Sequence, residues 1–365
     1  MRGQISSVHM LRGVAAMLVV WAHLSAYWLF TIGDTSWIQD TWRGVIAEPL
    51  HIYQDGGFLG VVLFFLISGY IVTHASLSEN RTSYLTKRVL RIFPPLAFAL
   101  AVLWTLMHVM PSLGIPLPVF QGAPADRWLQ SLLLLDFFTT GPRVLSVTWT
   151  LAVELIFYAM VFAVIGQQRS RPLASTTGMV TVWVIACWFI TGSALEGRVT
   201  PEAEGVVVLV GVLLVGRCIY LVHSGLANPR AAAALGVVAA LLVGVFQERY
   251  SPGFLLERAG TAGEPVISFV LALVLFVGML WWAPSRAVQP FAWLGDISYS
   301  LYLLHLPVGF AALGVLHRLD VPNSLATLLA TGAALLAATA AFHLVEKPSQ
   351  RLARRLLTRR AKVTA

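Results

Sequence analysis

Long apolar runs alternate with short polar segments over the whole chain. A helix that crosses a bilayer needs about 20 mainly apolar residues, and ten runs reach or approach that length. They cover residues 12–34, 56–78, 92–111, 144–168, 172–195, 205–223, 231–247, 265–285, 292–316 and 321–345. The pattern predicts an all-α, polytopic integral membrane protein with about ten transmembrane helices. The apolar stretch at 128–138 is too short to span, and we expect it to be interfacial or re-entrant.

The distribution of Lys and Arg predicts the orientation, because cytoplasmic loops are enriched in these residues. With the N-terminus inside, the inner segments hold 17 of them and the outer loops hold seven. Both termini are therefore expected in the cytoplasm, with the chain in a bacterial plasma (inner) membrane. This bias explains the net charge of +8 without a nucleic-acid partner. We expect a transmembrane domain over residues 1–346, a basic cytoplasmic tail over 347–365 and no fused soluble domain.

The composition supports this class. Charged residues make up 12% of the chain, about half the usual share of a soluble domain. A soluble globular enzyme, a disordered chain and a disulfide scaffold are thereby excluded. Cys187 and Cys218 lie in apolar runs, which predicts neither a disulfide nor a metal site. No metal-ligand spacing and no phosphate-cradling Walker loop occurs, so we expect no metal, no permanently bound cofactor and no ATP drive.

Polar residues inside the apolar runs carry the candidate chemistry, since they are costly in a bilayer and usually face a cavity or a partner. Arg12 and His23 are 11 residues apart. That spacing is about three helical turns, so the two residues share a face and differ by about 16 Å in depth. A buried neutral imidazole can accept a proton. His23 is either such a base or a packing histidine bonded to a neighbouring helix.

A second candidate lies at the cytosolic mouth of the third span. Arg88 and Arg91 are three residues apart and share a face. Pro94 and Pro95 follow, and because proline suits a first helical turn, we expect the helix to start near Ile92. A helix amino end beside two arginines predicts a phosphate site. Ordinary anchoring of a cytoplasmic loop is the alternative.

Two further candidates lie deeper. Glu154 is a carboxylate near mid-membrane, expected to be protonated or paired with an arginine or a histidine, with a structural ion pair as the alternative. Ser298, Tyr302 and His305 follow the i, i+4, i+7 spacing of one helix face. That stripe either joins helices or lines an acceptor cavity. Pro348, which cannot continue a helix, is expected to close the last one.

Taken in order, these segments resemble the acyltransferase type 3 family of integral membrane acyltransferases. The resemblance covers nearly the whole chain and rests on Leu11-Arg12-Gly13 with His23, Phe64-Phe-Leu-Ile-Ser-Gly-Tyr70, Arg88-Val-Leu-Arg91-Ile-Phe-Pro94, Trp149-Thr-Leu-Ala-Val-Glu154, Ile297-Ser-Tyr-Ser-Leu-Tyr-Leu-Leu-His305 and Glu346-Lys-Pro348. The chain departs from the family pattern at His9 and Val62, where an acidic residue is common, and at Tyr70, where phenylalanine is commoner.

The resemblance implies transfer of an acyl group, usually acetyl, from cytosolic acyl-CoA to a hydroxyl of an extracytoplasmic molecule, usually a glycan. His23 would be the general base or the acyl carrier, and Glu154 would orient or charge-balance the site. The residues expected to bind acetyl-CoA, the co-substrate, are Arg12, Arg88 and Arg91. The residues expected to contact the acceptor are Tyr302, His305, Ser298 and Trp149. The expected partners are acyl-CoA, a glycan or lipid-linked saccharide, and membrane lipid.

Other functions stay open at this point. Within the enzyme class, a small molecule such as a macrolide sugar is the alternative acceptor. A secondary transporter would also have ten spans and buried ionisable groups, although we find no inverted repeat. A non-catalytic partner in polysaccharide assembly would tolerate changes at His23 and at the arginine pair.

Overall fold

The structure is a computed structural model that describes residues 2–115, 117, 120, 122–192, 200–249, 265–281 and 291–363. None of these residues lies in a strand. The α-helices are α1 (Arg2–Trp21), α2 (Trp28–Ile32), α3 (Trp37–Trp42), α4 (Gly57–Ser76), α5 (Arg81–Ser112), α6 (Ala125–Leu132), α7 (Trp149–Val164), α8 (Pro172–Ile190), α9 (Pro201–Ser224), α10 (Pro229–Arg249), α12 (Pro265–Trp281), α13 (Ala292–Arg318), α14 (Asn323–Ala341) and α15 (Lys347–Val363). Three π-helical segments are Ala22–Tyr27, Arg43–Ala47 and Phe342–Glu346, and two 3₁₀ turns are Tyr53–Gly56 and Ser146–Thr148.

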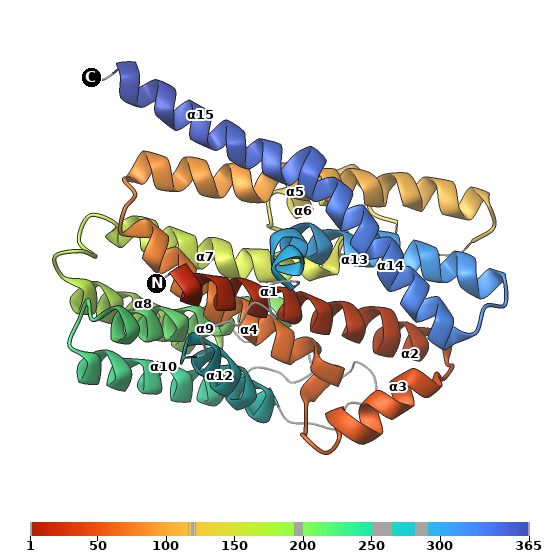
Figure 1. Ribbon diagram of the computed structural model, residues 1–365, viewed down its shortest axis with the longest axis horizontal. Helices are drawn as coiled ribbons and strands as arrows, with labels where there is room; N and C mark the ends of the chain where they lie inside the picture. The colour runs from red at the N-terminus through yellow and green to blue at the C-terminus, as the bar shows by residue number, and fades with distance from the viewer. Residues whose placement is uncertain are drawn as a thin grey trace.

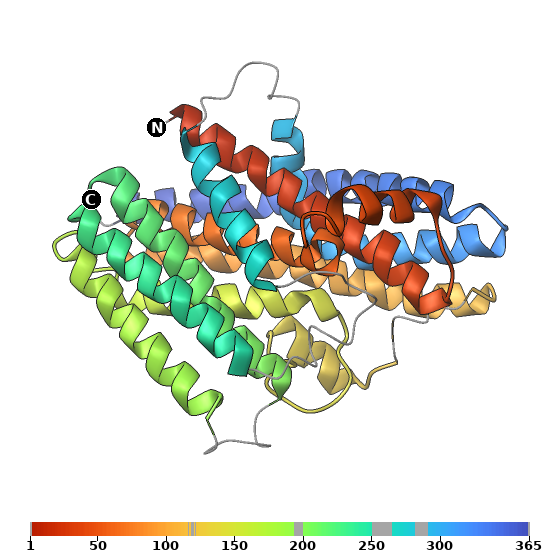
Figure 2. The same cartoon turned by 90° about the horizontal axis from the view of Figure 1, so that it is seen from below.

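The expected spans coincide with helices. Among the described residues, nine helical stretches are long and apolar enough to cross a membrane, and α12 is a shorter apolar helix. Together they account for all ten expected spans, although the span ends at 193–195 and 282–285 lie outside the described residues. The first and last ends of the chain lie toward the same end of the bundle (Figures 1 and 2). An even number of crossings requires that arrangement.

Helices α4, α9 and α13 form the centre of the bundle. Their apolar windows are 83%, 83% and 78% buried, against 22% for α10. Helices α8 and α10 lie against α9 on one side of the bundle, and α5 and α15 lie on the other (Figure 1). The centre packs closely because α4 and α9 meet at two glycines: a Cβ on Gly69 would lie 2.0 Å from Leu213 O, and one on Gly216 would lie 2.3 Å from Leu66 O. The close helix contact expected at Ser68-Gly69 is thus present.

The expectation that the third span begins near Ile92 is wrong. Helix α5 begins at Arg81, where the Asn80 side chain caps it by accepting a hydrogen bond from Ser83 N at 2.8 Å. Pro94 and Pro95 lie inside the helix. Proline removes an intrahelical donor, and the Tyr299 hydroxyl of α13 donates to Ile92 O at 3.0 Å beside this weakened turn. Arg88 and Arg91 therefore lie in a helix interior, so no helix amino end is available to them.

The last helix does not close at Pro348 either. It continues as α15 after the π-helical segment Phe342–Glu346. The Lys347 N–H bonds to Phe342 O, five residues back. This wider turn admits the ring of Pro348, which would clash with the carbonyl four residues back in a regular α-helix. The basic tail expected from residue 347 is thus a direct extension of the last span.

Candidate active site

A buried cavity of about 360 Å³ lies where α1, α4, α5, α7 and α13 meet the π-helical segment before α15. Five of the residues singled out in the sequence line it: Arg12, Arg91, Glu154, Ser298 and Tyr302. The apolar part of the lining comes mainly from α4, including Phe64, Phe65 and Ile71. Ionisable groups at this depth are costly unless they face a cavity or one another. Here they do both, which marks the cavity as the candidate active site.

Four charged side chains line the inner part of this cavity, two arginines and two glutamates. Arg12 and Arg91 each interact electrostatically with both Glu154 and Glu346. Glu154 accepts a hydrogen bond from the Tyr158 hydroxyl at 2.8 Å. Glu346 is 3% exposed and accepts from Ser300 Oγ at 2.7 Å and from Gln350 Nε2 at 3.2 Å. Glu154 was expected to be protonated or paired with a cation; two arginines interact with it electrostatically.

Tyr302 lies on the cavity wall and is held by α7. Its hydroxyl donates to Val147 O at 2.9 Å and accepts from Thr150 Oγ1 at 2.9 Å. The ring meets Phe64 edge to face, with 5.6 Å between the ring centroids. Ser298, one turn earlier, donates to Gly295 O within its own helix. The polar stripe expected on this helix thus faces the cavity at both positions.

Two histidines lie behind Tyr302. The ring centroids of Tyr302 and His305 are 5.8 Å apart, and those of His305 and His23 are 5.1 Å apart. His305 Nδ1 lies 2.8 Å from Tyr302 O and His305 Nε2 lies 3.3 Å from His23 Nδ1. His23 Nδ1 is also 2.8 Å from Val19 O.

These contacts define the tautomers of the pair. A carbonyl oxygen only accepts, so both Nδ1 atoms must carry the hydrogen. His305 Nε2 is then an acceptor for His23 Nδ1–H, and the basic lone pair of His23 is on Nε2. His23 lies in the π-helical segment Ala22–Tyr27, a distortion that is frequent at functional sites.

Besides the two histidines, two further expected site residues lie outside the cavity lining. Arg88 is 9% exposed, lies 3.6 Å from Glu79 and packs over the rings of Tyr84 and Tyr158. Its neighbour three residues on, Arg91, lines the cavity. Trp149 packs edge to face against Phe65, with 6.0 Å between ring centroids. Their binding roles stay predictions, and their contacts are those of packing residues.

The sequence reasoning missed several cavity residues. Glu346 was interpreted as part of a helix end, and Tyr158 and Tyr299 were not singled out. The signal for Glu346 was available, because a carboxylate follows 25 residues that contain no Asp or Glu. At the cavity mouth, His9 Nε2 and Asp296 Oδ1 form a 3.0 Å pair between α1 and α13. Gly295 permits this approach, since a Cβ there would lie 2.3 Å from His9 O.

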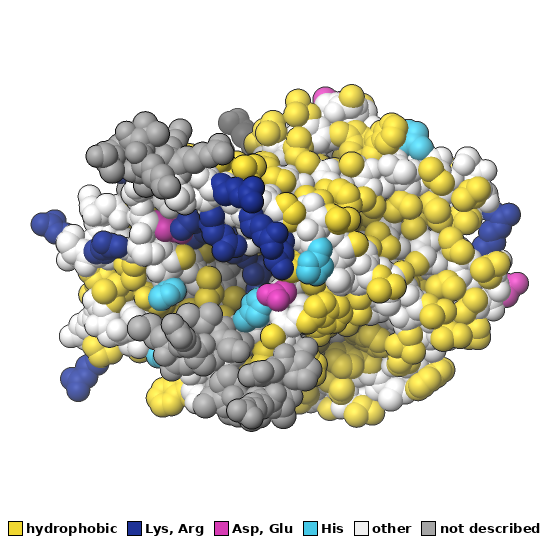
Figure 3. Space-filling view, turned by 45° about the horizontal axis from the view of Figure 1, so that its top comes forward, with side chains coloured by type: hydrophobic (Ala, Val, Ile, Leu, Met, Phe, Trp, Pro, Cys, Tyr) yellow, Lys and Arg dark blue, Asp and Glu magenta, His cyan; other side chains and the backbone are white. Residues whose placement is uncertain are grey.

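One face of the molecule shows how charge is arranged outside the cavity. Several Lys and Arg side chains gather in a central group, with Asp or Glu and His side chains beside them, and a wide hydrophobic surface adjoins this group (Figure 3). Such a hydrophobic surface is expected where lipid contacts the protein. Among the described residues, no three His, Cys, Asp or Glu side chains are grouped to hold a metal ion.

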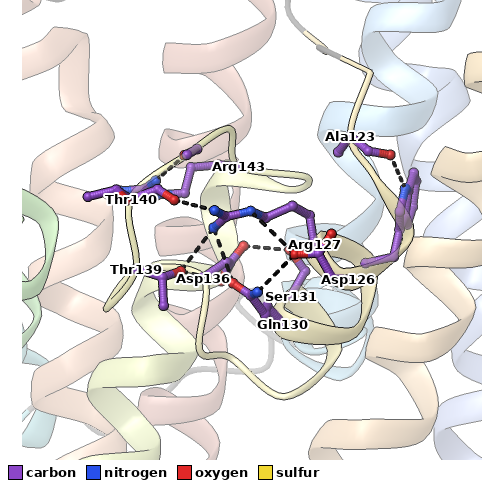
Figure 4. Close-up of polar contacts among 11 residues, drawn as sticks. Ala123, Asp126, Arg127, Gln130, Ser131, Asp136, Thr139, Thr140 and Arg143 are labelled. Atoms are coloured by element: carbon purple, nitrogen blue, oxygen red, sulfur yellow. Dashed lines mark hydrogen bonds and ion pairs between the residues drawn. The ribbon is translucent and has the colours of Figure 1, made fainter.

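The segment between α5 and α7 is held by a polar cluster around Arg127 and Asp136 (Figure 4). Arg127 donates to Gln130 Oε1 at 3.1 Å, to Thr139 Oγ1 at 3.0 Å and to Thr140 O. Asp136 is fully buried and accepts from Ser131 Oγ at 2.5 Å. Burial raises the pKa of the Asp136 carboxyl, although the Ser131 hydrogen bond and the nearby arginine charges act in the opposite direction. Residues 128–138, expected to be interfacial or re-entrant, thus form the end of α6 and the turns that follow it, a segment that we call the cap. Its depth in a membrane stays a prediction.

The fold and the cavity define a multi-pass helical membrane protein with a buried ionisable site. A family model described as an acyltransferase domain matches residues 5–343. The chain belongs to this family, the acyltransferase type 3 family that its motifs resemble.

Curated relatives are similar at low identity. The O-acetyltransferase OatA of Staphylococcus aureus (strain NCTC 8325 / PS 47) is 24% identical over 297 residues, which cover 73% of this chain and 48% of that protein. The putative peptidoglycan O-acetyltransferase YrhL of Bacillus subtilis (strain 168) is 25% identical over 351 residues, covering 84% and 53%. Nodulation protein 10 of Rhizobium leguminosarum bv. viciae is 30% identical over 178 residues, covering 43% of each. The chain spans about half the length of these relatives. No solved structure matches it.

Proposed function

We propose that this protein is a membrane O-acetyltransferase that moves an acetyl group from cytosolic acetyl-CoA to a hydroxyl of an extracytoplasmic glycan. The observation that carries the proposal is a chain of side-chain contacts from the ionisable cavity, in which the cavity residue Tyr302 packs against His305 and His305 contacts His23. The names of OatA and YrhL, O-acetyltransferases at low identity, support the reaction, and the name of YrhL supports a glycan acceptor. In this proposal the chain lies in a bacterial plasma membrane, and the end of the bundle that holds both termini is cytoplasmic.

The donor enters from that cytoplasmic end. Its thioester reaches the part of the cavity near Tyr302 and Ser298, and Arg12 and Arg91 offset negative charge on the way. Rotation of the Tyr302 O–H away from Val147 O would direct it at the thioester carbonyl. The acceptor approaches His23 from the opposite, extracytoplasmic end.

His23 is the catalytic base in this mechanism. His23 Nε2 takes the proton of the acceptor hydroxyl as its oxygen forms a bond to the thioester carbonyl carbon. The carbon–sulfur bond then breaks, and His23 returns the proton to the CoA thiolate. His305 is a positioning residue: its Nε2 accepts from His23 Nδ1–H and so keeps the basic lone pair on His23 Nε2. Glu154 and Glu346 hold the arginines in place and balance their charge.

Radiolabelled acetyl transfer tests the proposal. The protein is reconstituted in nanodiscs with [acetyl-¹⁴C]CoA and peptidoglycan fragments as acceptor, and acetyl esters are counted. His108→Ala is a matched control, since His108 Nδ1 bonds to a carbonyl four residues back, as His23 does, but it is exposed on α5. We expect His23→Ala to abolish transfer and His108→Ala to retain it.

The same assay can refute each part. If His23→Ala transferred acetyl groups at the wild-type rate, His23 would not be the catalytic base. A wild type that transfers no acetyl group to any glycan or macrolide acceptor, yet moves a solute across vesicles, would make the protein a transporter. If acid quenching traps a labelled protein that His23→Ala lacks, His23 is an acyl carrier rather than a base.

A further inference from the structure

The charges of the cavity balance one another. Its lining contains two arginines, Arg12 and Arg91, and two glutamates, Glu154 and Glu346. At the mouth, His9 pairs with Asp296, which adds a carboxylate and at most one further cation. CoA carries several negative charges on a diphosphate and a 3′-phosphate. Arg12 and Arg91 can offset only part of this charge, because the two glutamates oppose them, so the phosphates require further cations elsewhere.

The size of the cavity leads to the same conclusion. About 360 Å³ is near the lower end of the roughly 300–1,000 Å³ range of small-molecule sites. That space suits the slender, uncharged pantetheine arm and its acyl group. The nucleotide end of the donor must then remain at or beyond the mouth.

The arginines that could offset the phosphates lie on α15, directly beyond the mouth of the cavity. Phe342, Glu346 and Gln350 line the cavity from this chain segment. Arg351 and Arg354 follow, and both are exposed. Arg354 is one turn past Gln350, about 6 Å along the axis, and Arg351 is three residues from Arg354 and so shares its face. No Asp or Glu occurs from Lys347 to the end of the sequence.

The position of α15 is fixed by packing. Ala353 is 3% exposed, and α15 runs beside the first half of α5 (Figure 1). The Lys347 ammonium lies 5.8 Å from the centroid of the Phe342 ring, a cavity residue. The helix therefore presents its cations at a defined place relative to the cavity, which a free basic tail would not do.

We propose that α15 binds the phosphate groups of the acyl-CoA donor through Arg351 and Arg354, while the cavity holds the pantetheine arm. This inference rests on the proposed acyl-CoA donor. Arginine suits the role because its guanidinium donates in pairs to phosphate oxygens. The donor would lie along the α15 axis and enter the cavity past Gln350. Anionic lipid headgroups offer the same phosphate chemistry, and the test separates the two.

The test compares two donors that differ only in the nucleotide end. Binding of acetyl-CoA and of S-acetylpantetheine is measured by calorimetry on the full chain in zwitterionic nanodiscs. The test variant is Arg351→Gln/Arg354→Gln. The control is Arg171→Gln/Arg230→Gln, which removes two exposed arginines from the starts of α8 and α10. We expect the test variant to lose at least tenfold in affinity for acetyl-CoA and to bind S-acetylpantetheine as wild type does. The control should bind both donors normally.

The other outcomes overturn the inference or the proposed function separately. Equal affinity of wild type and test variant for acetyl-CoA would exclude α15 as the phosphate site, as would an equal loss for both donors. If the variant differs from wild type only in nanodiscs that contain phosphatidylglycerol, α15 binds lipid. If wild type binds acetyl-CoA with the expected dependence on α15 but transfers no acetyl group, the proposed function fails and the phosphate site stands. A wild type that binds neither donor would refute both.

Discussion

Two regions of the membrane domain hold arginine in different ways. Arg12 and Arg91 line a cavity together with two carboxylates. Arg217, on α9, is 1% exposed and donates to neutral side chains: Thr176 Oγ1 at 2.8 Å, Ser175 Oγ at 3.3 Å and Gln168 Oε1 at 3.4 Å. These partners belong to α8 and to the turn between α7 and α8. The first region combines charge with space for a ligand, and the second uses a charge to hold three chain segments together.

Depth in the membrane alone therefore does not identify a functional arginine. The arginines of the first region lie near opposite charges, and the arginine of the second is hydrogen-bonded, so both charges are offset. Only the first has an opening, opposite charges and a histidine pair nearby. The same distinction separates Arg91 from Arg88 within a single helix.

The largest expected difference is between Arg12→Met and Arg217→Met. Loss of Arg12 leaves two carboxylates against one arginine in the cavity. We expect kcat/KM to fall roughly 100- to 1,000-fold, about 3–4 kcal/mol, as is typical when one partner of a buried charge pair is removed. Arg217→Met should stay within about twofold of wild type, because a hydrophobic isostere of a buried charge is often tolerated. Thr176 and Ser175 also keep their bonds to Pro172 O.

Acetyl transfer and thermal unfolding of both variants check this prediction. If Arg217→Met lost activity while its unfolding temperature and elution profile stayed normal, the division between a site region and a packing region would be wrong. If Arg12→Met kept full activity, the cavity would not be the donor site.

Two buried tyrosines give the next contrast. The Tyr302 hydroxyl borders the cavity, whereas the Tyr84 hydroxyl donates to Tyr158 O at 3.2 Å in a packed region. Loss of an oxyanion donor costs about 100-fold in kcat, and we expect that loss for Tyr302→Phe with little change in KM. Tyr84→Phe should leave kcat unchanged and lower stability by about 1 kcal/mol. Steady-state kinetics with varied acetyl-CoA distinguish the two variants. If their kcat values were equal, Tyr302 would have no role in the mechanism.

Arg91→Gln and Arg88→Gln sharpen the contrast within α5. Arg91→Gln should lower kcat/KM roughly tenfold, since Arg12 still offsets part of the negative charge. Arg88→Gln should mainly destabilise the fold, by about 1–2 kcal/mol, because Glu79 loses one cation and two rings lose a cation–π contact. Glu79 keeps its 2.9 Å bond from Lys87. If Arg88→Gln lost most of its activity at unchanged thermal stability, Arg88 would belong to the donor site, as the sequence predicts.

The smallest expected effect concerns Asp136 in the cap. Burial raises the pKa of this carboxyl, so the folded state holds the proton more tightly than the unfolded state. Asp136 therefore contributes most at low pH, and the contribution is lost as pH rises through the folded-state pKa. Asp136→Asn should match wild type near pH 4 and become relatively more stable toward pH 8, by about 1 kcal/mol or less. Thermal unfolding across that range measures the difference, and a difference that grows toward low pH would contradict the burial argument.

The sequence by itself determined the ten apolar helices, the family and the residue types of the site. Helix-length hydrophobic runs are sufficient for the first, since a bilayer leaves few alternatives to a helix. Arg12, Glu154 and Tyr302 could be picked out because a polar side chain is conspicuous in an apolar run.

Only the tertiary structure decided which of these residues share a cavity. Arg88 and Arg91 look equivalent in the sequence, yet the continuous helix α5 turns one toward Glu79 and the other into the cavity. The π-helical segments before Trp28 and Lys347 shift the helix register around His23 and Glu346, and hydrophobicity does not encode such a shift. Glu346 interacts electrostatically with Arg12, and His305 contacts His23, across most of the chain length. Whether residues so far apart in the sequence come close together depends on how whole helices pack, and local patterns of polar and apolar residues do not specify that packing.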